Sequence, residues 1–238
     1  MGSGVEAFGR KSLPGKETYS SLNLINPDQP SLNGLDQKLQ QYLDYDNGFF
    51  IEAGANDGYS QSNTYFLEKK RAWRGLLVEG IPELYSLAQK RRPQSEVYNY
   101  ALVSPDYKEK TVKMHYANLM SLVDGSMKTG DQQERHLRSG MEVQKLESTY
   151  SLHVPACTLE SLLRKYPTLK RIDFLSLDVE GYELQVLQGA NLDVYRPVYI
   201  LVEARFFDEV NSFLCSKDYE LIDKLSVHDC LYKDCLVQ

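Results

Sequence analysis

Short apolar runs alternate with helix-patterned segments along most of this chain, and this alternation is the strongest constraint on its fold. The apolar runs occupy residues 49–53, 75–79, 97–103, 172–178 and 198–203. Helical spacing of apolar residues predicts helices over 33–45, 62–70, 82–91, 158–165, 182–188 and 207–216. Apolar strands that alternate with helices are typical of a parallel sheet covered on both faces. We therefore predict an α/β fold of the Rossmann-like, doubly wound kind.

Three segments depart from this alternation. Residues 219–225 and 230–237 predict a terminal hairpin. Residues 106–156 predict a strand over 110–116 and then a long excursion from the sheet, with several glycines and a charged run. Because long insertions are often functional, we expect residues 117–150 to form a mobile lid over a substrate pocket. Residues 1–32, rich in Ser, Gly, Pro and Asn, predict an irregular arm before a single domain over 33–238.

Composition narrows the class of protein. The 238 residues carry 27 basic and 33 acidic side chains, so the formal net charge is 27 − 33 = −6. An acidic chain argues against a broad grip on nucleic acid, and no apolar stretch is long enough for a membrane helix. The four cysteines form no C-x-x-C pair. We expect a cytoplasmic protein with reduced thiols and with no nucleic-acid or membrane partner.

The ends of the first three predicted strands carry residues suited to a nucleotide. In residues 52–58 (EAGANDG), Gly54 and Gly58 let the backbone turn and approach a ligand closely. Glu79 follows Gly58 by 21 residues, the spacing at which an acid binds ribose hydroxyls in nucleotide folds. Asn99 and Ala101 on the third strand would then face the base. Taken singly, the glycine turn could merely close a strand, and Glu79 could be a solvated acid.

Three pieces of the sequence together resemble the FkbM family of S-adenosylmethionine-dependent methyltransferases. They are residues 52–58, Glu79 after LLV, and residues 172–187 (IDFLSLDVEGYELQVL). The resemblance covers about residues 48–203. It implies a class I methyltransferase fold, with a seven-stranded sheet whose last strand is antiparallel, and O-methylation of a small-molecule, natural-product or sugar hydroxyl. The expected contacts to S-adenosylmethionine are Glu52, Gly54, Ala55, Asn56, Gly58, Glu79, Asn99, Ala101 and Asp178.

The fourth and fifth strands end on acids that suit methyl transfer to oxygen. Asp178 would lie beside the transferred methyl group, where it can orient the acceptor hydroxyl and take its proton, with Glu180 two residues further on. Asp178 and Glu203 could also supply two oxygen ligands to Mg²⁺. Alternatively Glu203 is a polar strand end, and Glu180 and Glu183 are acids favoured at a helix N-terminus. Three histidines of the insertion are further candidates for a base: His115, His136 and His153.

Two other functions remain open from the sequence. The first is an NAD-dependent oxidoreductase or epimerase, which the Gly54-x-x-x-Gly58 spacing disfavours because dinucleotide folds use G-x-G-x-x-G. The Tyr-x-x-x-Lys pair of such enzymes occurs over 65–69, early in the chain, and over 166–170, where Pro167 does not suit a helix. The second is a nucleotide-binding module without catalytic activity.

Overall fold

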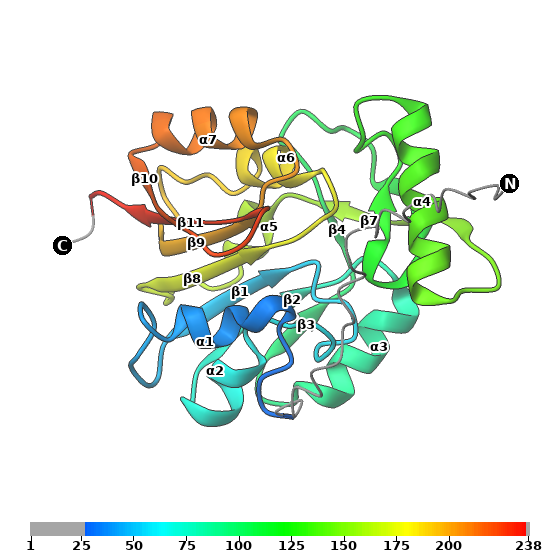
Figure 1. The fold of residues 1–238 in the computed structure, drawn as a ribbon. Helices are drawn as coiled ribbons and strands as arrows, with labels where there is room; N and C mark the ends of the chain where they lie inside the picture. Colours follow the sequence, from blue (N-terminus) through cyan, green and yellow to red (C-terminus); the bar gives the residue numbers. More distant parts are fainter. Residues whose placement is uncertain (1–26, 237–238) are drawn as a thin grey trace, which may run out of the picture.

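A seven-stranded sheet runs through the middle of the molecule in this computed structural model, which describes residues 27–236 (Figure 1). The strand order is β10-β11-β9-β8-β1-β2-β3. β11 is antiparallel to both of its neighbours, and the other strands run in one direction. The predicted sheet with an antiparallel last strand is therefore confirmed. The strands are β1 (Phe49–Ala53), β2 (Arg74–Val78), β3 (Glu96–Tyr98), β8 (Ile172–Leu177), β9 (Pro197–Glu203), β10 (Tyr219–Lys224) and β11 (Asp229–Asp234).

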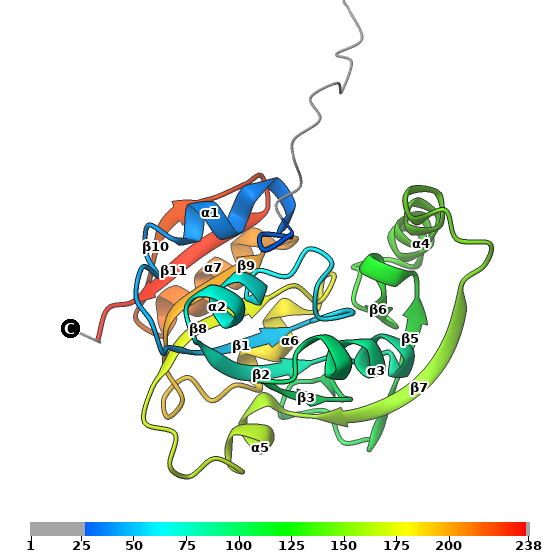
Figure 2. The ribbon, with the colours of Figure 1, turned by 90° about the horizontal axis from the view of Figure 1, so that it is seen from below.

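Helices cover both faces of this sheet (Figures 1 and 2). One face carries α1 (Leu35–Leu39), α2 (Tyr65–Lys70) and α3 (Pro82–Arg91), and the other carries α5 (Leu159–Leu163), α6 (Glu183–Gln188) and α7 (Phe207–Ser216). Successive strand residues point to opposite faces, so Ile51 joins one core and Phe50 the other. Apolar residues at nearly every strand position are thus buried, as expected of a doubly covered parallel sheet.

Three predicted helices are shorter in the structure by three residues or more, and one of them is α5, which spans Leu159–Leu163 rather than residues 158–165. α1 ends at Leu39 rather than at residue 45, and turns carry Leu43 into the same core. α2 begins at Tyr65 rather than at residue 62, because the hydroxyls of Ser62 and Thr64 bond the Glu52 carboxylate instead of continuing a helix. The later start of α2 thus depends on side-chain bonds to a residue of β1, which local spacing does not report.

The predicted third strand, residues 97–103, is wrong as a single element. β3 ends at Tyr98, and the chain then leaves the main sheet to form β4 (Ala101–Leu102) in a second sheet. The Asn99 side-chain amide donates to the carbonyl oxygens of Glu79 at 2.9 Å and Gly80 at 2.8 Å. These two bonds hold the chain at the break.

The insertion leaves the main sheet and forms a second, smaller sheet, of which the sequence predicted only the strand over 110–116. Its strand order is β4-β7-β5-β6, with β5 (Thr111–Tyr116), β6 (Leu122–Val123) and β7 (Tyr150–Cys157). β7 pairs antiparallel with β5 along the whole of β5, from Thr111 to Tyr116. The short helix η2 (Asn118–Met120) and the helix α4 (Gly130–Gln144) complete it. The insertion stands beyond the carboxyl ends of the parallel strands (Figure 2).

The remaining sequence-based expectations concern the arm, the cysteines and membranes. The predicted arm over 1–32 lies outside the described residues except for 27–32, where Ser31 bridges to Gln61 and the short helix η1 (Leu32–Gly34) begins. All four cysteines, which are at positions 157, 215, 230 and 235, are free thiols. Along residues 27–236, no helix combines the length and apolar character that a membrane crossing requires.

Candidate active site

A cavity of about 870 Å³, measured out to its open mouth, lies between the carboxyl ends of the parallel strands and the insertion. The turn after β1 forms one wall. Gly54 has φ = +81°, and a Cβ there would lie 1.7 Å from the carbonyl oxygen of Asp178. Only glycine lets the ends of β1 and β8 approach so closely. The predicted residues that line the cavity are Glu52, Gly54, Ala55, Asn56, Glu79, Ala101, Asp178 and Glu180.

Glu79 closes the turn from the end of β2. Its carboxylate accepts hydrogen bonds from the backbone N–H groups of Asn56 at 2.8 Å and Ile81 at 2.7 Å. Burial raises the pKa of Glu79 to about 7, although these backbone donors oppose the shift. A buried acid with so high a pKa is a frequent mark of a functional site.

Two predicted cofactor residues lie behind the cavity wall. Gly58 packs on α3, where a Cβ would lie 3.0 Å from the Cα of Ala88. The side-chain amide of Asn99 donates to the carbonyl oxygens of Glu79 and Gly80 in the loop after β2. Neither is among the residues that line the cavity. Their direct contact with a cofactor stays a prediction.

The structure also shows a buried arginine that sequence reasoning missed. Arg92, at the end of α3, is fully buried, and its Nε donates to Glu68 Oε2 at 2.8 Å. Its Nη1 lies 3.3 Å from Glu52 Oε2, and the Glu52 carboxylate also accepts from the hydroxyls of Ser62 and Thr64. Glu52 therefore belongs to a charged network beneath the turn after β1. The sequence did not indicate that Arg92 is buried, because basic residues at helix ends are usually exposed.

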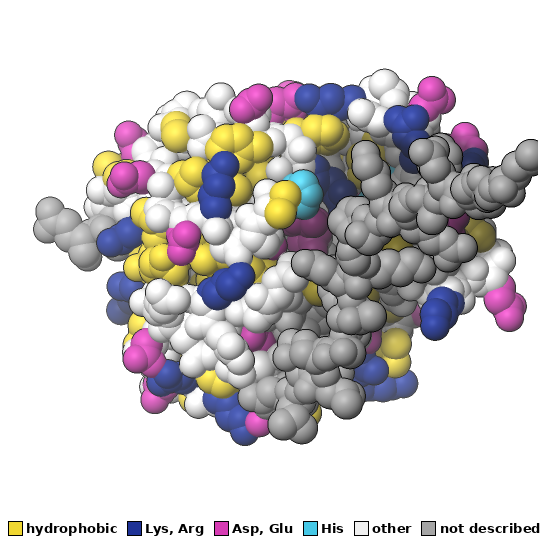
Figure 3. All heavy atoms as spheres, in the orientation of Figure 1, with side chains coloured by type: hydrophobic (Ala, Val, Ile, Leu, Met, Phe, Trp, Pro, Cys, Tyr) yellow, Lys and Arg dark blue, Asp and Glu magenta, His cyan; other side chains and the backbone are white. Residues whose placement is uncertain are grey.

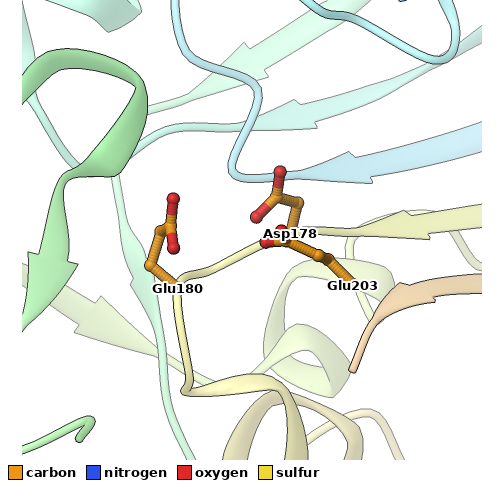
Figure 4. A group of neighbouring side chains, drawn as sticks. All are labelled: Asp178, Glu180 and Glu203. Atoms are coloured by element: carbon orange, nitrogen blue, oxygen red, sulfur yellow. The ribbon is translucent and has the colours of Figure 1, made fainter. Parts of the chain in front are cut away.

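Three carboxylates gather at the other end of the cavity: Asp178, Glu180 and Glu203 (Figure 4). One oxygen atom from each lies within 4.8 Å of the others. Asp178 is open to the cavity, yet its deep position and the charges of Glu203 and Glu180 raise the pKa of its carboxyl well above the usual range. Burial raises the pKa of Glu180 to about 8, against the pull of Arg205. The structure thus brings together the three acids that the sequence singled out, and their catalytic and metal-binding roles stay predictions.

Glu180 owes its orientation to a strained turn. Its φ is +54°, and Gly181 follows with φ = +92°. A non-glycine residue in this region is uncommon and is often found at functional sites. The Ser126 hydroxyl from the insertion donates to the Glu180 carbonyl at 3.0 Å. Glu183, two residues after Gly181, is the first residue of α6, which agrees with the alternative of an acid at a helix N-terminus. Its Oε1 accepts a hydrogen bond from the Gly181 N–H at 2.7 Å.

Arg205 is the second residue that the sequence did not reveal. It is ion-paired with Glu180 and lies 3.7 Å from Glu203, measured from its Nη2 to Oε2. The predicted Mg²⁺ gains no support from this arrangement, since a guanidinium already lies against two of the three carboxylates.

One of the three candidate histidines reaches the acid cluster. His136 on α4 lies 3.6 Å from Glu180, between Nε2 and Oε2, and contacts the Met120 carbonyl at 3.1 Å. Burial lowers the pKa of His136. His115 pairs with Asp124 instead, and His153 is exposed. Neither of these two lines the cavity.

The insertion supplies the wall opposite the strand ends. Met114, Leu119 and Val123 give it an apolar surface, and Asn118 and Ser121 add polar groups. The cavity therefore carries polar and apolar residues on both walls. A lining of this kind suits a nucleoside cofactor at the strand ends and a second molecule beneath the insertion.

The strand order, the antiparallel β11 and a cavity at the carboxyl ends define a class I methyltransferase fold. The family described as "Methyltransferase FkbM domain" matches residues 52–224, which is more than half of the chain. The chain belongs to the FkbM methyltransferase family. Its family and fold are those of S-adenosylmethionine-dependent methyltransferases, as the sequence predicted.

Solved structures with similar folds are distant in sequence. A methyltransferase FkbM from Methylobacillus flagellatus KT is 14% identical, with a TM-score of 0.48, over 79% of this chain and 44% of its own. A TehB-like SAM-dependent methyltransferase from Corynebacterium glutamicum is 8% identical, with a TM-score of 0.43, over 84% of this chain and 87% of its own. A SAM-dependent methyltransferase from Aquifex aeolicus is 10% identical, with a TM-score of 0.41, over 88% of this chain and 93% of its own. The comparison with curated proteins finds no match.

Proposed function

We propose that this protein transfers a methyl group from S-adenosylmethionine to a hydroxyl of a small molecule, natural product or sugar. The observation that carries the proposal is the position of Asp178. Its carboxylate opens into the same cavity whose other wall is the glycine turn and Glu79. A carboxylate with a raised pKa beside the acceptor is suited to take the proton of a hydroxyl.

Each part of the cavity has its own role in the proposed methyl transfer. Glu79 accepts hydrogen bonds from the ribose, and the backbone after Gly54 leaves room for the cofactor at the strand ends. The bound cofactor supplies an electrophilic methyl group on a sulfonium. Asp178 would orient the acceptor oxygen for in-line attack and receive its proton as the new C–O bond forms, while the methyl C–S bond of the cofactor would break and S-adenosylhomocysteine would leave. The insertion covers the acceptor and excludes water.

Turnover of S-adenosylmethionine with a panel of hydroxylated small molecules and sugars tests this proposal. We expect methylated product and S-adenosylhomocysteine in equal amounts for at least one acceptor class. A matched panel of amines and thiols is the control. Product from these alone would contradict O-methylation while leaving methyl transfer intact.

We expect Glu79→Ala to weaken S-adenosylhomocysteine binding about 25-fold, because charge-assisted bonds to the ribose of about 2 kcal/mol are lost. Isothermal titration calorimetry measures the affinity. Glu160→Ala on α5, an acid outside the cavity lining, is the control and should leave it unchanged. Urea unfolding checks that the loss of the Asn56 and Ile81 contacts has not unfolded the variant. Unchanged affinity in a folded Glu79→Ala protein would remove Glu79 from the cofactor site.

We propose that residues 117–150 act as the lid over the acceptor. Asn118, Leu119 and Ser121 of this segment line the cavity, and α4 packs on η2 through Gly140, where a Cβ would lie 3.2 Å from that of Met120. Lids close to complete a site and exclude water. Hydrogen exchange of the backbone amides in this segment should slow at least several-fold when S-adenosylhomocysteine and the acceptor are both bound. Equal protection with and without ligands would indicate a rigid insertion.

The oxidoreductase alternative gains no support from the residues that line the cavity. The tyrosines and lysines at 65, 69, 166 and 170 are absent from its lining, so neither Tyr-x-x-x-Lys pair is placed to serve an oxidoreductase. On the face shown in Figure 3, basic and acidic side chains are interspersed, which agrees with a small neutral or polar acceptor rather than nucleic acid. A cytoplasmic location stays a prediction.

A further inference from the structure

The acid cluster at the cavity end needs a positive charge. Glu180 and Glu203 have side chains only 8% and 21% exposed, and Asp178 faces them with an oxygen within 4.8 Å. Carboxylates this close and this buried repel one another unless a cation or protons compensate them. Two kinds of cation could compensate these carboxylates: a bound metal ion or a basic side chain of the protein.

Arg205 occupies that place. It follows β9 directly, and its guanidinium is ion-paired with Glu180 and lies 3.7 Å from Glu203. Backbone bonds fix its position, because Ala204 N–H donates to the His228 carbonyl at 2.9 Å and Arg205 N–H to the Glu203 carbonyl at 3.0 Å. A guanidinium is permanently charged, and the Nη2 atom of Arg205 lies near a carboxylate oxygen of both Glu180 and Glu203.

A divalent cation does not fit the cluster in this arrangement. Mg²⁺ needs about six oxygen ligands at roughly 2.1 Å. The Arg205 guanidinium lies against Oε2 of Glu180 and Oε2 of Glu203, two of the oxygens that such an ion would take. His136 approaches the same Glu180 oxygen at 3.6 Å from the side of the insertion. A guanidinium thus already lies against two of the three carboxylates that would ligate a metal.

We propose that Arg205 is a positioning residue that takes the place of a metal ion in this site. It fixes the carboxylates of Glu180 and Glu203 and leaves Asp178, the exposed member of the cluster, as the carboxylate that acts on the acceptor. This inference rests on the proposed function, since the role of Asp178 in methyl transfer is part of it. The mechanism then needs no divalent cation, and the predicted pair of ligands at Asp178 and Glu203 is replaced by an ion-paired cluster.

Manganese binding tests the inference without any assay of activity. The signal of free Mn²⁺ in electron paramagnetic resonance is followed as full-length protein is added. We expect no binding by the wild type at millimolar Mn²⁺, and none by Arg205→Lys, which keeps a charge. Arg205→Gln should gain a site, because three carboxylates then lack their cation, and Glu203→Gln in the same protein should abolish it. One-to-one binding of Mn²⁺ by the wild type that Glu203→Gln abolishes would overturn the proposal.

Kinetics separate positioning from a purely structural role. Arg205→Gln should lower kcat about tenfold to a hundredfold, as expected when a reacting group is misplaced, while S-adenosylhomocysteine affinity changes little. Arg205→Lys should recover part of kcat. Arg171→Gln, which removes an arginine paired with Asp173 at the opposite end of β8, is the matched control and should change neither quantity. An unaltered kcat in folded Arg205→Gln, or loss of wild-type turnover on chelation, would contradict the inference.

The two proposals fail in distinguishable ways. If the wild type binds no S-adenosylhomocysteine and transfers no methyl group, the proposed function is wrong, while the Mn²⁺ titrations still decide the role of Arg205 in the cluster. If methyl transfer proceeds but requires a divalent cation, the proposed function stands and the inference on Arg205 is wrong.

Discussion

Asp178→Asn is expected to lower turnover about a hundredfold or more, while the affinity for S-adenosylhomocysteine stays within a few-fold of the wild type. The change keeps the shape of the side chain and removes its capacity to accept a proton. Because Asp178 is open to the cavity, its loss should not destabilise the fold. Initial rates under saturating cofactor, calorimetric titration and urea unfolding measure the three quantities.

Asp193→Asn is the matched control for that experiment. Asp193 is 68% exposed and pairs with Lys217, outside the cavity lining, so its replacement should leave turnover unchanged. Near-normal turnover in Asp178→Asn would reject the role of Asp178 as base or orienting group. A loss shared by Asp178→Asn and Glu203→Gln and reproduced by chelator would restore the metal mechanism.

Arg92→Met is expected to have the largest effect on stability, reducing the free energy of unfolding by about 3–5 kcal/mol. The reason is that Glu52 and Glu68, with side chains 6% and 0% exposed, would lose their buried cation. Urea denaturation measures the change. The turn after β1 rests on this network, so cofactor affinity should fall as well.

Arg91→Met, at the preceding residue, which is the last of α3, offers a matched control. Its guanidinium is 41% exposed and pairs with Asp57, and exposed pairs contribute at most about 1 kcal/mol. Replacing Glu68 by Gln in the Arg92→Met protein should restore part of the stability, since one unpaired charge is removed. Equal small losses for Arg91→Met and Arg92→Met would show that the buried network does not stabilise the fold.

The residues that could be predicted lie at strand ends. Carboxyl ends of parallel strands share one edge of a sheet, so the strand pattern alone placed Gly54, Glu79 and Asp178 around one cavity. Their positions follow from local apolar runs, which the sequence displays directly. The antiparallel β11 was implied by the family resemblance and not by spacing.

The residues that could not be predicted depend on partners far along the chain. Arg92 contacts Glu68 and Glu52, which precede it by 24 and 40 residues, and nothing local distinguishes it from an exposed arginine. Its position near the end of a strand led to the prediction that Glu52 contacts the cofactor. In the structure its carboxylate accepts hydrogen bonds from Ser62 and Thr64 in the loop after β1. The strand β7, which pairs with β5, was not predicted for a different, local reason: Pro155 weakens the sequence pattern of a strand.

Calorimetric titration of the full chain with S-adenosylhomocysteine, and separately with NAD, tests the central claim most directly. We predict saturable one-to-one binding of S-adenosylhomocysteine that Glu79→Ala weakens, and no binding of NAD under the same conditions. Binding of NAD with none of S-adenosylhomocysteine would contradict the assignment of the cavity to a methyl-donor cofactor.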